Sequence, residues 1–353
     1  MTRIRPVRPA LACIVLAVTA VAPAHAAEFA VTWPGDAPAA DGGLSLREAL
    51  ARAAQEPGPD VVTLAAGRIV LTDCAAGPLV VGDGDGVVLD GAGSELVQSC
   101  AGQPAVRVTG SADIRRLSVG TTPGVDPAPA VVTSGVLWLR GVTVTGATGP
   151  GVACTGCTTL VITGADVSGN AGGGVRVDAP TTRASVVIRD SRITGNRAPG
   201  PGGGISITGG GTRPSHTFID RTVVTGNVAG STGGGGIASS GSDVYLSRSV
   251  VQGNTAGRDE DPASGGGVWF RAPERLPESG ISVVDTSVSG NTASLAGGGL
   301  SITGGGTIRV IGTRVTGNTA GAQGGGLALQ ANRPDAALRI DRSRIVGNHA
   351  GPA

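Results

Sequence analysis

The chain has 353 residues, of which 62 are Gly and only seven are Phe, Trp or Tyr. Its formal net charge is +1, from 27 basic and 26 acidic residues. So few aromatic side chains argue against an ordinary compact globular core, and the irregular spacing of Gly excludes collagen. The balanced charge gives no general attraction to nucleic acid or to an anionic membrane surface.

The first 26 residues have the pattern of a secretion signal. Three arginines lie within the first eight residues, and the apolar stretch Ala10–Val21 follows them. Ala24-His25-Ala26 is a small-x-small cleavage site, which predicts a mature chain that begins near Ala27. The apolar stretch is too short to span a membrane. We therefore expect export to the periplasm, the cell surface or the medium, with no membrane span in the mature chain.

Residues 27–60 are expected to form an N-terminal cap. The segment SLREALAR from Ser45 to Arg52 is the strongest helix pattern in the chain, and Ser45 with Glu48 fits a capping box. A stack of parallel strands leaves an unpaired edge at its first coil, and a short amphipathic helix can cover that edge.

A repeated motif, aliphatic-x-Gly-Asn, occupies much of residues 61–353. It ends at seven asparagines, Asn170, Asn196, Asn227, Asn254, Asn291, Asn318 and Asn348. The steps between them are 26, 31, 27, 37, 27 and 30 residues, and a Gly-rich run follows each of the first six. A repeat of this length is one supersecondary unit that must stack on copies of itself.

Each repeat is predicted to be one coil of about three short strands. The residue three before each Asn is always Val or Ile, the residue eight before it is always aliphatic, and aliphatic pairs at spacing two follow the Gly runs. Gly and Asn tolerate the left-handed backbone of sharp bends, and stacked Asn amides can form a hydrogen-bonded ladder. We expect a parallel β-helix of about eleven coils, roughly 50 Å long at about 4.8 Å per coil.

Three motifs resemble those of secreted β-helix proteins. Ser45–Ala49, SLREA, resembles the CSLREA motif of exported bacterial β-helix proteins, with Leu44 in place of its Cys. Val88–Gly93 is similar to the LDGAG element of pectate-lyase-like β-helices, and the repeats are similar to those of polymorphic outer-membrane proteins. The resemblance implies a right-handed parallel β-helix of the pectate-lyase-like fold.

Two functions are consistent with this resemblance. The first is an exported, non-enzymatic scaffold, adhesin-like or glycan-binding, whose partner is a polysaccharide or another cell-surface ligand. The alternative is a polysaccharide lyase or glycoside hydrolase. The NTD, DD, GHG and RIK segments typical of polygalacturonases are absent from the sequence, which favours the scaffold. The chain could also be part of a larger surface protein.

Charged residues six positions before the Asn are expected to pair between coils. The alignment places Asp190 beside Arg221 and Arg248 beside Asp285. Surface ion pairs of this kind contribute about 0–1 kcal/mol each, so we interpret them as structural.

The predicted ligand-binding groove lies between two long loops that flank a short one. Its candidate residues are Trp269, Arg271, Glu274, Arg275, Arg213 and His216. Trp269 stands between inward Val268 and Phe270, so it should point outward, with the small Ala238 and Ser301 as column neighbours. An outward Trp on a flat sheet can stack on a sugar ring, or the long loop can cover it. No catalytic residue is assigned. For His216 as a catalytic base, the sequence identifies no partner residue.

Four cysteines follow the signal, and we expect two disulfides in an oxidising compartment. Cys74 and Cys100 are 26 residues apart, about one coil, and Cys154 and Cys157 can close a tight local bridge. A redox pair or half of a zinc site would need a second CxxC or a nearby His. We expect no metal and no cofactor.

Overall fold

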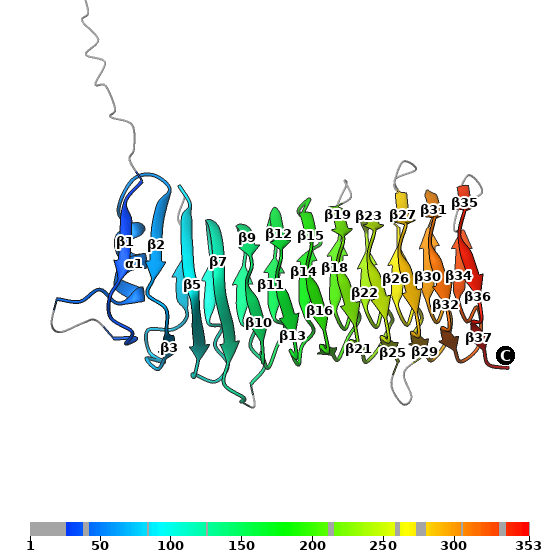
Figure 1. Ribbon diagram of the computed structural model, residues 1–353, viewed down its shortest axis with the longest axis horizontal. Coiled ribbons are helices and arrows are strands. Elements are labelled where there is room, and N and C mark those ends of the chain that lie inside the picture. The colour runs from blue at the N-terminus through cyan, green and yellow to red at the C-terminus, as the bar shows by residue number, and fades with distance from the viewer. Residues whose placement is uncertain are drawn as a thin grey trace, which may run out of the picture.

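The computed structural model describes residues 26–352 except 38–41, 83–84, 125, 211–214, 258–261, 273–279, 305 and 332–336. Within this part of the chain, the strands coil into an elongated rod with β1 at one end and β37 at the other (Figure 1). All strand pairs are parallel, and each strand pairs with strands of the coils before and after it. The structure thus confirms the predicted parallel β-helix.

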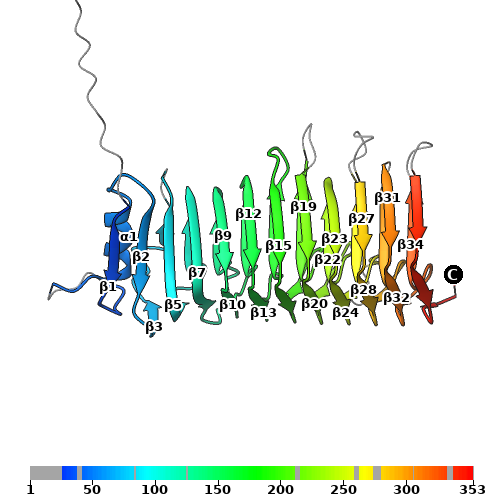
Figure 2. The same ribbon diagram turned by 45° about the horizontal axis from the view of Figure 1, so that its top comes forward.

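Two ladders of the 21-stranded sheet form adjoining faces of the rod, and they join where the long strands β5 and β7 take part in both. The first ladder comprises β1 (Glu28–Val31), β2 (Asp60–Leu64), β5 (Val87–Gln98), β7 (Ser111–Thr121), β9 (Val136–Arg140), β12 (Thr159–Thr163), β15 (Ser185–Arg189), β19 (Ser215–Asp220), β23 (Ser242–Ser247), β27 (Gly280–Val284), β31 (Thr307–Ile311) and β35 (Ala337–Asp341). Besides β5 and β7, the second ladder comprises β3 (Arg68–Leu71), β10 (Thr143–Thr145), β13 (Asp166–Ser168), β16 (Arg192–Thr194), β20 (Val223–Thr225), β24 (Val250–Gln252), β28 (Ser287–Ser289), β32 (Arg314–Thr316) and β36 (Arg344–Val346). Figure 2 shows the first-ladder strands side by side along the rod.

Two further sheets complete each coil. The ten-stranded sheet comprises β4 (Leu79–Val81), β6 (Val106–Val108), β8 (Val131–Thr133), β11 (Val152–Thr155), β14 (Val175–Ala179), β18 (Ile205–Gly209), β22 (Ile237–Ser240), β26 (Val268–Arg271), β30 (Leu300–Gly304) and β34 (Leu327–Ala331). The six-stranded sheet comprises β17 (Arg197–Ala198), β21 (Val228–Ala229), β25 (Thr255–Ala256), β29 (Thr292–Ala293), β33 (Thr319–Ala320) and β37 (His349–Ala350).

The rod has about ten turns, rather than the eleven expected. The difference lies at its C-terminal end, where the last coil contributes β35, β36 and β37 but, among the described residues, no strand of the ten-stranded sheet. The predicted core columns are confirmed: Val167, Val224 and Val288, each three residues before an Asn, are fully buried.

Gly and Asn have different roles at the corner of each coil. The Gly of the motif takes the left-handed backbone, for example at Gly226 with φ +64 and Gly253 with φ +62. The Asn instead forms the ladder: Asn227 Nδ2 donates to Asn254 Oδ1 at 3.0 Å, and the Asn227 backbone N–H donates to the same oxygen at 2.9 Å. The expected ladder of stacked Asn amides is therefore present, and the left-handed backbone falls on the Gly before each Asn.

The N-terminal cap begins with β1 and α1 (Leu46–Ala53). The predicted capping box of Ser45 and Glu48 is present. The apolar face of α1 lies against the first coil, and it buries Leu46, Ala49, Leu50 and Ala53. The helix therefore covers the core at this end of the rod, as the sequence predicted.

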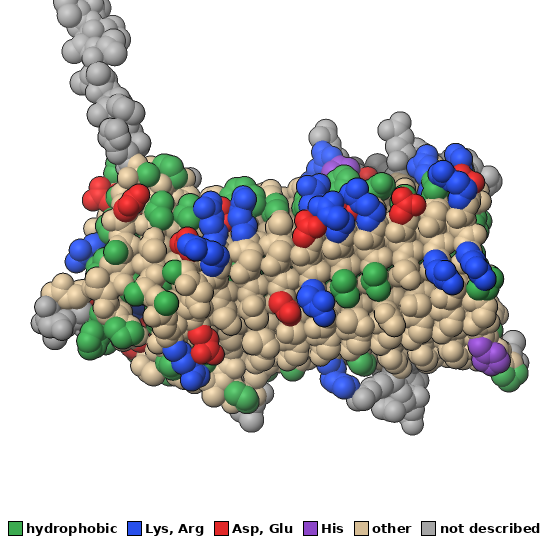
Figure 3. Space-filling view, viewed as in Figure 1, with side chains coloured by type: hydrophobic (Ala, Val, Ile, Leu, Met, Phe, Trp, Pro, Cys, Tyr) green, Lys and Arg blue, Asp and Glu red, His purple; other side chains and the backbone are tan. Residues whose placement is uncertain are grey.

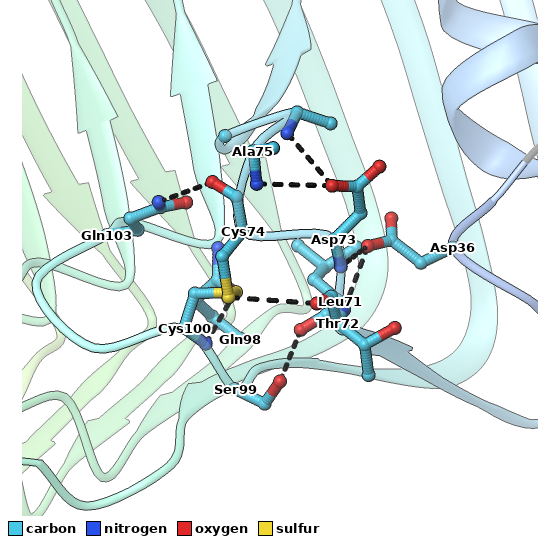
Figure 4. Close-up of a disulfide and its surroundings, with 12 residues drawn as sticks. Asp36, Leu71, Thr72, Asp73, Cys74, Ala75, Gln98, Ser99, Cys100 and Gln103 are labelled. Carbon is cyan, nitrogen blue, oxygen red and sulfur yellow. Dashed lines mark hydrogen bonds between the residues drawn. A yellow bond between two sulfur atoms is a disulfide. The ribbon is translucent and has the colours of Figure 1, made fainter.

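A buried ion pair fastens this cap to the first coil. Asp36 Oδ1 accepts from Arg47 Nε at 2.6 Å, and Asp36 Oδ2 accepts from the backbone N–H groups of Thr72 and Asp73 at 2.8 and 2.7 Å. The Asp36 side chain is 1% exposed. Figure 4 shows how Asp36 reaches the turn that also carries Cys74, whose disulfide with Cys100 links this turn to the next coil.

Candidate functional site

The candidate site lies on the outward face of the first ladder, over β19 and β23. Strand alternation turns Thr217 and Ile219 inward and leaves His216 and Phe218 outward. The register then pairs His216 with Asp243 and Phe218 with Tyr245 on the next coil. Figure 3 shows hydrophobic, basic and acidic side chains gathered over the middle of the rod on this face.

An aromatic pair forms the apolar part of the site. Phe218 is 43% exposed and Tyr245 is 41% exposed, and their ring centroids are 6.0 Å apart at an interplanar angle of 49°. Both rings lie on the outward face and are exposed, so burial in the core does not account for them. Exposed aromatic faces of this kind can take up a planar or ring-shaped apolar surface.

A polar triad lies next to the aromatic pair. His216 Nδ1 is 3.3 Å from Asp243 Oδ2, and Arg183 Nη2 contacts the other ring nitrogen, Nε2. Asp243 Oδ1 accepts from the Gly280 N–H at 3.1 Å. These contacts orient the imidazole and leave its ring edge and the carboxylate partly exposed, at 35% and 25%.

Together the two groups border a shallow depression of 230 Å³. Its lining residues are His216, Thr217, Phe218, Asp243, Val244, Tyr245, Gly280 and Ser282. The depression thus combines an apolar aromatic wall with hydrogen-bonding groups, the combination that small-ligand sites use for affinity and orientation.

A chain of four charges borders the site along the corner after β15, β19 and β23. Arg221 donates from Nε to Asp190 Oδ1 and from Nη1 to Asp220 Oδ2, both at 2.6 Å. Arg248 donates from Nε and Nη2 to the two oxygens of Asp220 at 2.8 and 2.7 Å. The predicted pairing of Asp190 with Arg221 is therefore present.

The predicted pairing of Arg248 with Asp285 was wrong. Asp220 lies one position before the corner, where its carboxylate is only 9% exposed. It can therefore offer both oxygens to Arg248, and this bidentate geometry is stronger than a single exposed contact. Asp285 instead lies against Gly312, where a side chain would collide with its carboxylate.

The network lowers the pKa of its carboxyl groups. Burial by itself would raise the pKa of Asp220, but hydrogen bonds from Ser247 and Arg248 and the charges of Arg221 and Arg248 outweigh it, so the pKa lies below its ordinary value. The hydrogen bond from Arg221 likewise lowers the pKa of Asp190. Both groups are thus held as anions by neighbouring guanidinium groups, which suits an ion-pair network better than a proton-transferring acid.

The structure places the sequence-predicted groove residues on different sheets. Trp269 lies on β26 of the ten-stranded sheet, between Ala238 and Ser301 as predicted, whereas His216 lies on the first ladder. Trp269 is half-buried, and its ring lies against Gly233, where a Cβ atom would meet Cγ at 3.0 Å. Arg271 ends β26 and is exposed.

Three predicted groove residues, Arg213, Glu274 and Arg275, lie outside the described residues. The role of Trp269 and Arg271 in ligand binding stays a prediction. Sequence reasoning missed Phe218 and Tyr245, although each stands nine positions before its Asn. That position is outward by strand alternation, so aligning it would have revealed the aromatic pair.

The cysteines are joined as two disulfides. The Cα atoms of Cys74 and Cys100 are 5.4 Å apart, and those of Cys154 and Cys157 are 5.6 Å apart. Cys154 and Cys157 are buried in the core, where a redox partner could not reach them. Among the described residues, no group of three or more His, Cys, Asp or Glu side chains could hold a metal ion.

No helix in the described part of the chain is both long enough and apolar enough to cross a membrane.

Comparisons with known proteins agree with the observed architecture. A family model described as the right handed beta helix region matches residues 130–352. A comparison with curated proteins gives no match.

Solved structures with a similar fold include an epimerase module, a tailspike protein and a pectate lyase. The Azotobacter vinelandii mannuronan C-5 epimerase AlgE6 A-module is 14% identical, with a TM-score of 0.45 and coverage of 90% of this chain and 99% of that chain. The Dettilon tailspike protein is 15% identical, with a TM-score of 0.40, and the match covers 84% of this chain and 64% of that chain. Pectate lyase Pel9A is 13% identical, with a TM-score of 0.39 and coverage of 88% and 78%.

Proposed function

The chain belongs to the right-handed β-helix family, and from this premise we propose that it is an exported, non-enzymatic scaffold that binds a polysaccharide. The ligand lies across the outward face of β19 and β23. The observation that carries the proposal is the exposed pair Phe218 and Tyr245 beside the polar triad of Arg183, His216 and Asp243.

The chemistry of this face suits a glycan. Pyranose rings have apolar C–H faces that stack on aromatic rings, and their hydroxyl groups need both donors and acceptors. Tyr245 Oη, Asp243 and Ser282 supply such groups around the depression. Because successive coils repeat along the rod, the face is long and flat, and an extended chain can lie along it.

The flanking charge favours a ligand with acidic groups. In the aromatic column, Ser282 follows Tyr245, and the two coils after it carry Arg309 and Arg339. On the other side, Arg183 contacts His216, which lines the depression. The mature chain as a whole gives no general electrostatic attraction, so this local arrangement would select where an acidic sugar docks.

A second candidate function is polysaccharide cleavage, and the pairing of His216 with Asp243 favours it. A carboxylate that orients an imidazole is the arrangement that general-base catalysis uses. In this structure, however, Arg183 contacts the ring nitrogen that would have to accept the proton. That contact is the reason to rank binding above cleavage.

The binding proposal is tested with the double variant Phe218→Ala/Tyr245→Ala. The substitution removes both rings, and with each ring the glycan loses about half of the apolar contact that a fully buried side chain would give. We therefore expect the affinity for the polysaccharide that the wild-type protein retains to fall about 10- to 100-fold. Retention is measured by affinity electrophoresis against a panel of acidic and neutral polysaccharides, with folding checked by circular dichroism.

Two control variants locate the site. Val187→Ala changes the same column one coil earlier and should leave affinity unchanged within about twofold. Trp269→Ala tests the alternative surface on the ten-stranded sheet. If only Trp269→Ala weakens retention, the site on β19 and β23 is excluded and the groove predicted from the sequence is favoured.

Cleavage is followed on the same panel by unsaturated-product absorbance and by reducing ends. The scaffold proposal expects neither signal from the purified protein. Turnover that disappears in Asp243→Asn and His216→Asn would establish the enzyme instead.

A further inference from the structure

A buried carboxylate lies where the cap meets the first coil. Asp60 is the first residue of β2, and it occupies an inward position in line with Val62 and Leu64. It is fully buried, at 0% exposure. Its own N–H donates to Gly86 O at 3.1 Å, which fixes the strand to the next coil.

Among the described residues, the carboxylate of Asp60 has a single hydrogen-bond donor. Asp60 Oδ1 accepts from the backbone nitrogen of Ala27 at 2.8 Å. Asp60 Oδ2 is buried and has no partner among the described residues, and none of their basic side chains lies within ion-pair distance of it. One amide donor does not offset the free-energy cost of burying a charged carboxylate.

Ala27 is also the residue at which the sequence predicts the mature chain to begin. It follows Ala24-His25-Ala26, a small-x-small cleavage site. The nitrogen that contacts Asp60 is the one that cleavage would convert into an α-amino group. Two independent observations, one from the sequence and one from the core, therefore meet at one atom.

We propose that the peptide bond between Ala26 and Ala27 is hydrolysed on export and that the new α-ammonium group of Ala27 forms a buried ion pair with Asp60. The C–N bond breaks, water supplies a hydroxyl group to the Ala26 carbonyl carbon and a hydrogen to the Ala27 nitrogen, and the amine takes up a proton. An α-amino group has a pKa of about 7.7–8.0, so it is mostly protonated at neutral pH.

The ion pair completes the hydrogen bonding of Asp60. An ammonium group has three donors where the peptide nitrogen has one, so it can reach Oδ2 as well as Oδ1. Cleavage leaves the rest of the contact in place, because Val61 N–H donates to Ala27 O at 2.9 Å and Glu28 pairs with Val61. Ala26 is exposed, so the bond is open to a peptidase.

The consequence is that maturation stabilises the cap. Among the described strands, β1 pairs only with β2 at the end of the first ladder, so it has a single strand neighbour. A buried ion pair at its first residue would fasten β1 at the point where an edge strand frays most easily.

The first test is the N-terminal sequence of the exported protein, which should begin at Ala27. The second compares the chain that begins at Ala27 with one that keeps Ala26 as an extra residue. Backbone hydrogen exchange at Val61, whose N–H donates to Ala27 O, reports the stability of the contact, and we expect it to be about tenfold faster in the extended chain.

The variant Asp60→Asn shows whether the extra Ala26 acts by removing an ion pair or only by adding a residue beside β1. It keeps the shape of the side chain and can still accept from Ala27 N, so adding Ala26 should change exchange by less than about twofold in this background. Asp85→Asn is the matched control, because Asp85 is an exposed carboxylate on the next coil that accepts from Gly58 N–H at 3.1 Å. In the Asp85→Asn background, the tenfold difference in hydrogen exchange between the chains with and without Ala26 should persist.

Two results would overturn the proposal. One is an exported protein that begins at another residue. The other is an effect of the extra Ala26 that is equally large with Asp60 and with Asp60→Asn, since that would mean that the carboxylate does not sense the new charge.

Discussion

The two ends of the rod differ although the same strand pattern builds both. At the N-terminal end, α1 covers the core, and Leu46 and Leu50 are buried against the first coil. At the C-terminal end, the inward positions of β35 stay open: Leu338 is 53% exposed and Ile340 is 44% exposed. One coil earlier, the equivalent residues Ile308 and Val310 are 3% and 0% exposed.

This difference shows that an inward side chain is buried by the next layer and not by its own strand. Each coil of a solenoid contacts only its neighbours, so the terminal coil has half of the usual contacts. The described part of the C-terminal coil therefore carries exposed apolar side chains and unpaired strand edges. At the N-terminal end, α1 covers the apolar side chains, and the buried ion pair of Asp36 and Arg47 fastens this cap to the first coil.

The largest expected effect comes from breaking the buried ion pair of Asp36 and Arg47 in the N-terminal cap. Asp36→Ala removes a carboxylate that is 1% exposed, and it leaves Arg47 with backbone acceptors but no ion-pair partner. Breaking a buried ion pair costs about 3–5 kcal/mol, and the loss should be confined to the cap and first coils. Urea unfolding and hydrogen exchange of α1 measure it.

The C-terminal counterpart is Asp341→Ala. Asp341 pairs with Arg339 at 3.1 Å, but their side chains are 36% and 65% exposed. We expect a loss of less than about 1 kcal/mol. Equal losses at the two ends would contradict the view that covering the coil sets the strength of these pairs.

The second prediction uses the Asn ladder, which runs from the middle of the rod to its C-terminal end. Asn254→Ala removes the oxygen that accepts from the Asn227 backbone N–H and Nδ2, and it removes the amide that donates to Val224 O, all in a fully buried site. Unsatisfied buried groups cost about 1–3 kcal/mol each, so we expect a loss of about 2–4 kcal/mol in thermal or urea unfolding.

Asn348→Ala makes the same change at the end of the ladder. Asn348 also accepts from the previous Asn, at 2.9 Å to Asn318 Nδ2. Its site is only partly buried, so water can replace the lost partner. The expected loss is about 1 kcal/mol, and a cost as large as that at Asn254 would show that the last coil is as well shielded as the interior.

The smallest effect concerns acid. The lowered pKa of Asp220 means that its contribution to stability is present above the unfolded-state value near pH 4 and is lost as the pH falls through the folded-state value. Asp220→Asn should lower stability by about 1.5–3 kcal/mol at pH 7 and by progressively less toward pH 3. Urea unfolding at both pH values measures the difference.

The matched control is Asp178→Asn. Asp178 pairs with Arg176 at 2.7 Å on an exposed face of β14, outside the network. Its substitution should change stability by less than about 1 kcal/mol at either pH. A pH dependence in the Asp178 variant equal to that of Asp220 would mean that the network adds nothing beyond single pairs.

The sequence was sufficient for the architecture because every coil repeats the same local rules. Spacing between the asparagines defined the register, and that register correctly placed Trp269 between Ala238 and Ser301. It was not sufficient for side-chain partners: Arg248 has two acidic residues within reach of its flexible chain, and only the buried position of Asp220 decides between them.

Local periodicity alone determined that this chain coils into a parallel β-helix with a helical cap, because alternation and turn residues act over a few positions. Tertiary structure decided what the coils bring together: Phe218 against Tyr245, His216 against Asp243, and Ala27 against Asp60. Each of these pairs joins residues about one coil apart or more. Whether they meet depends on burial, side-chain direction and the neighbouring coils, which no short stretch of sequence contains.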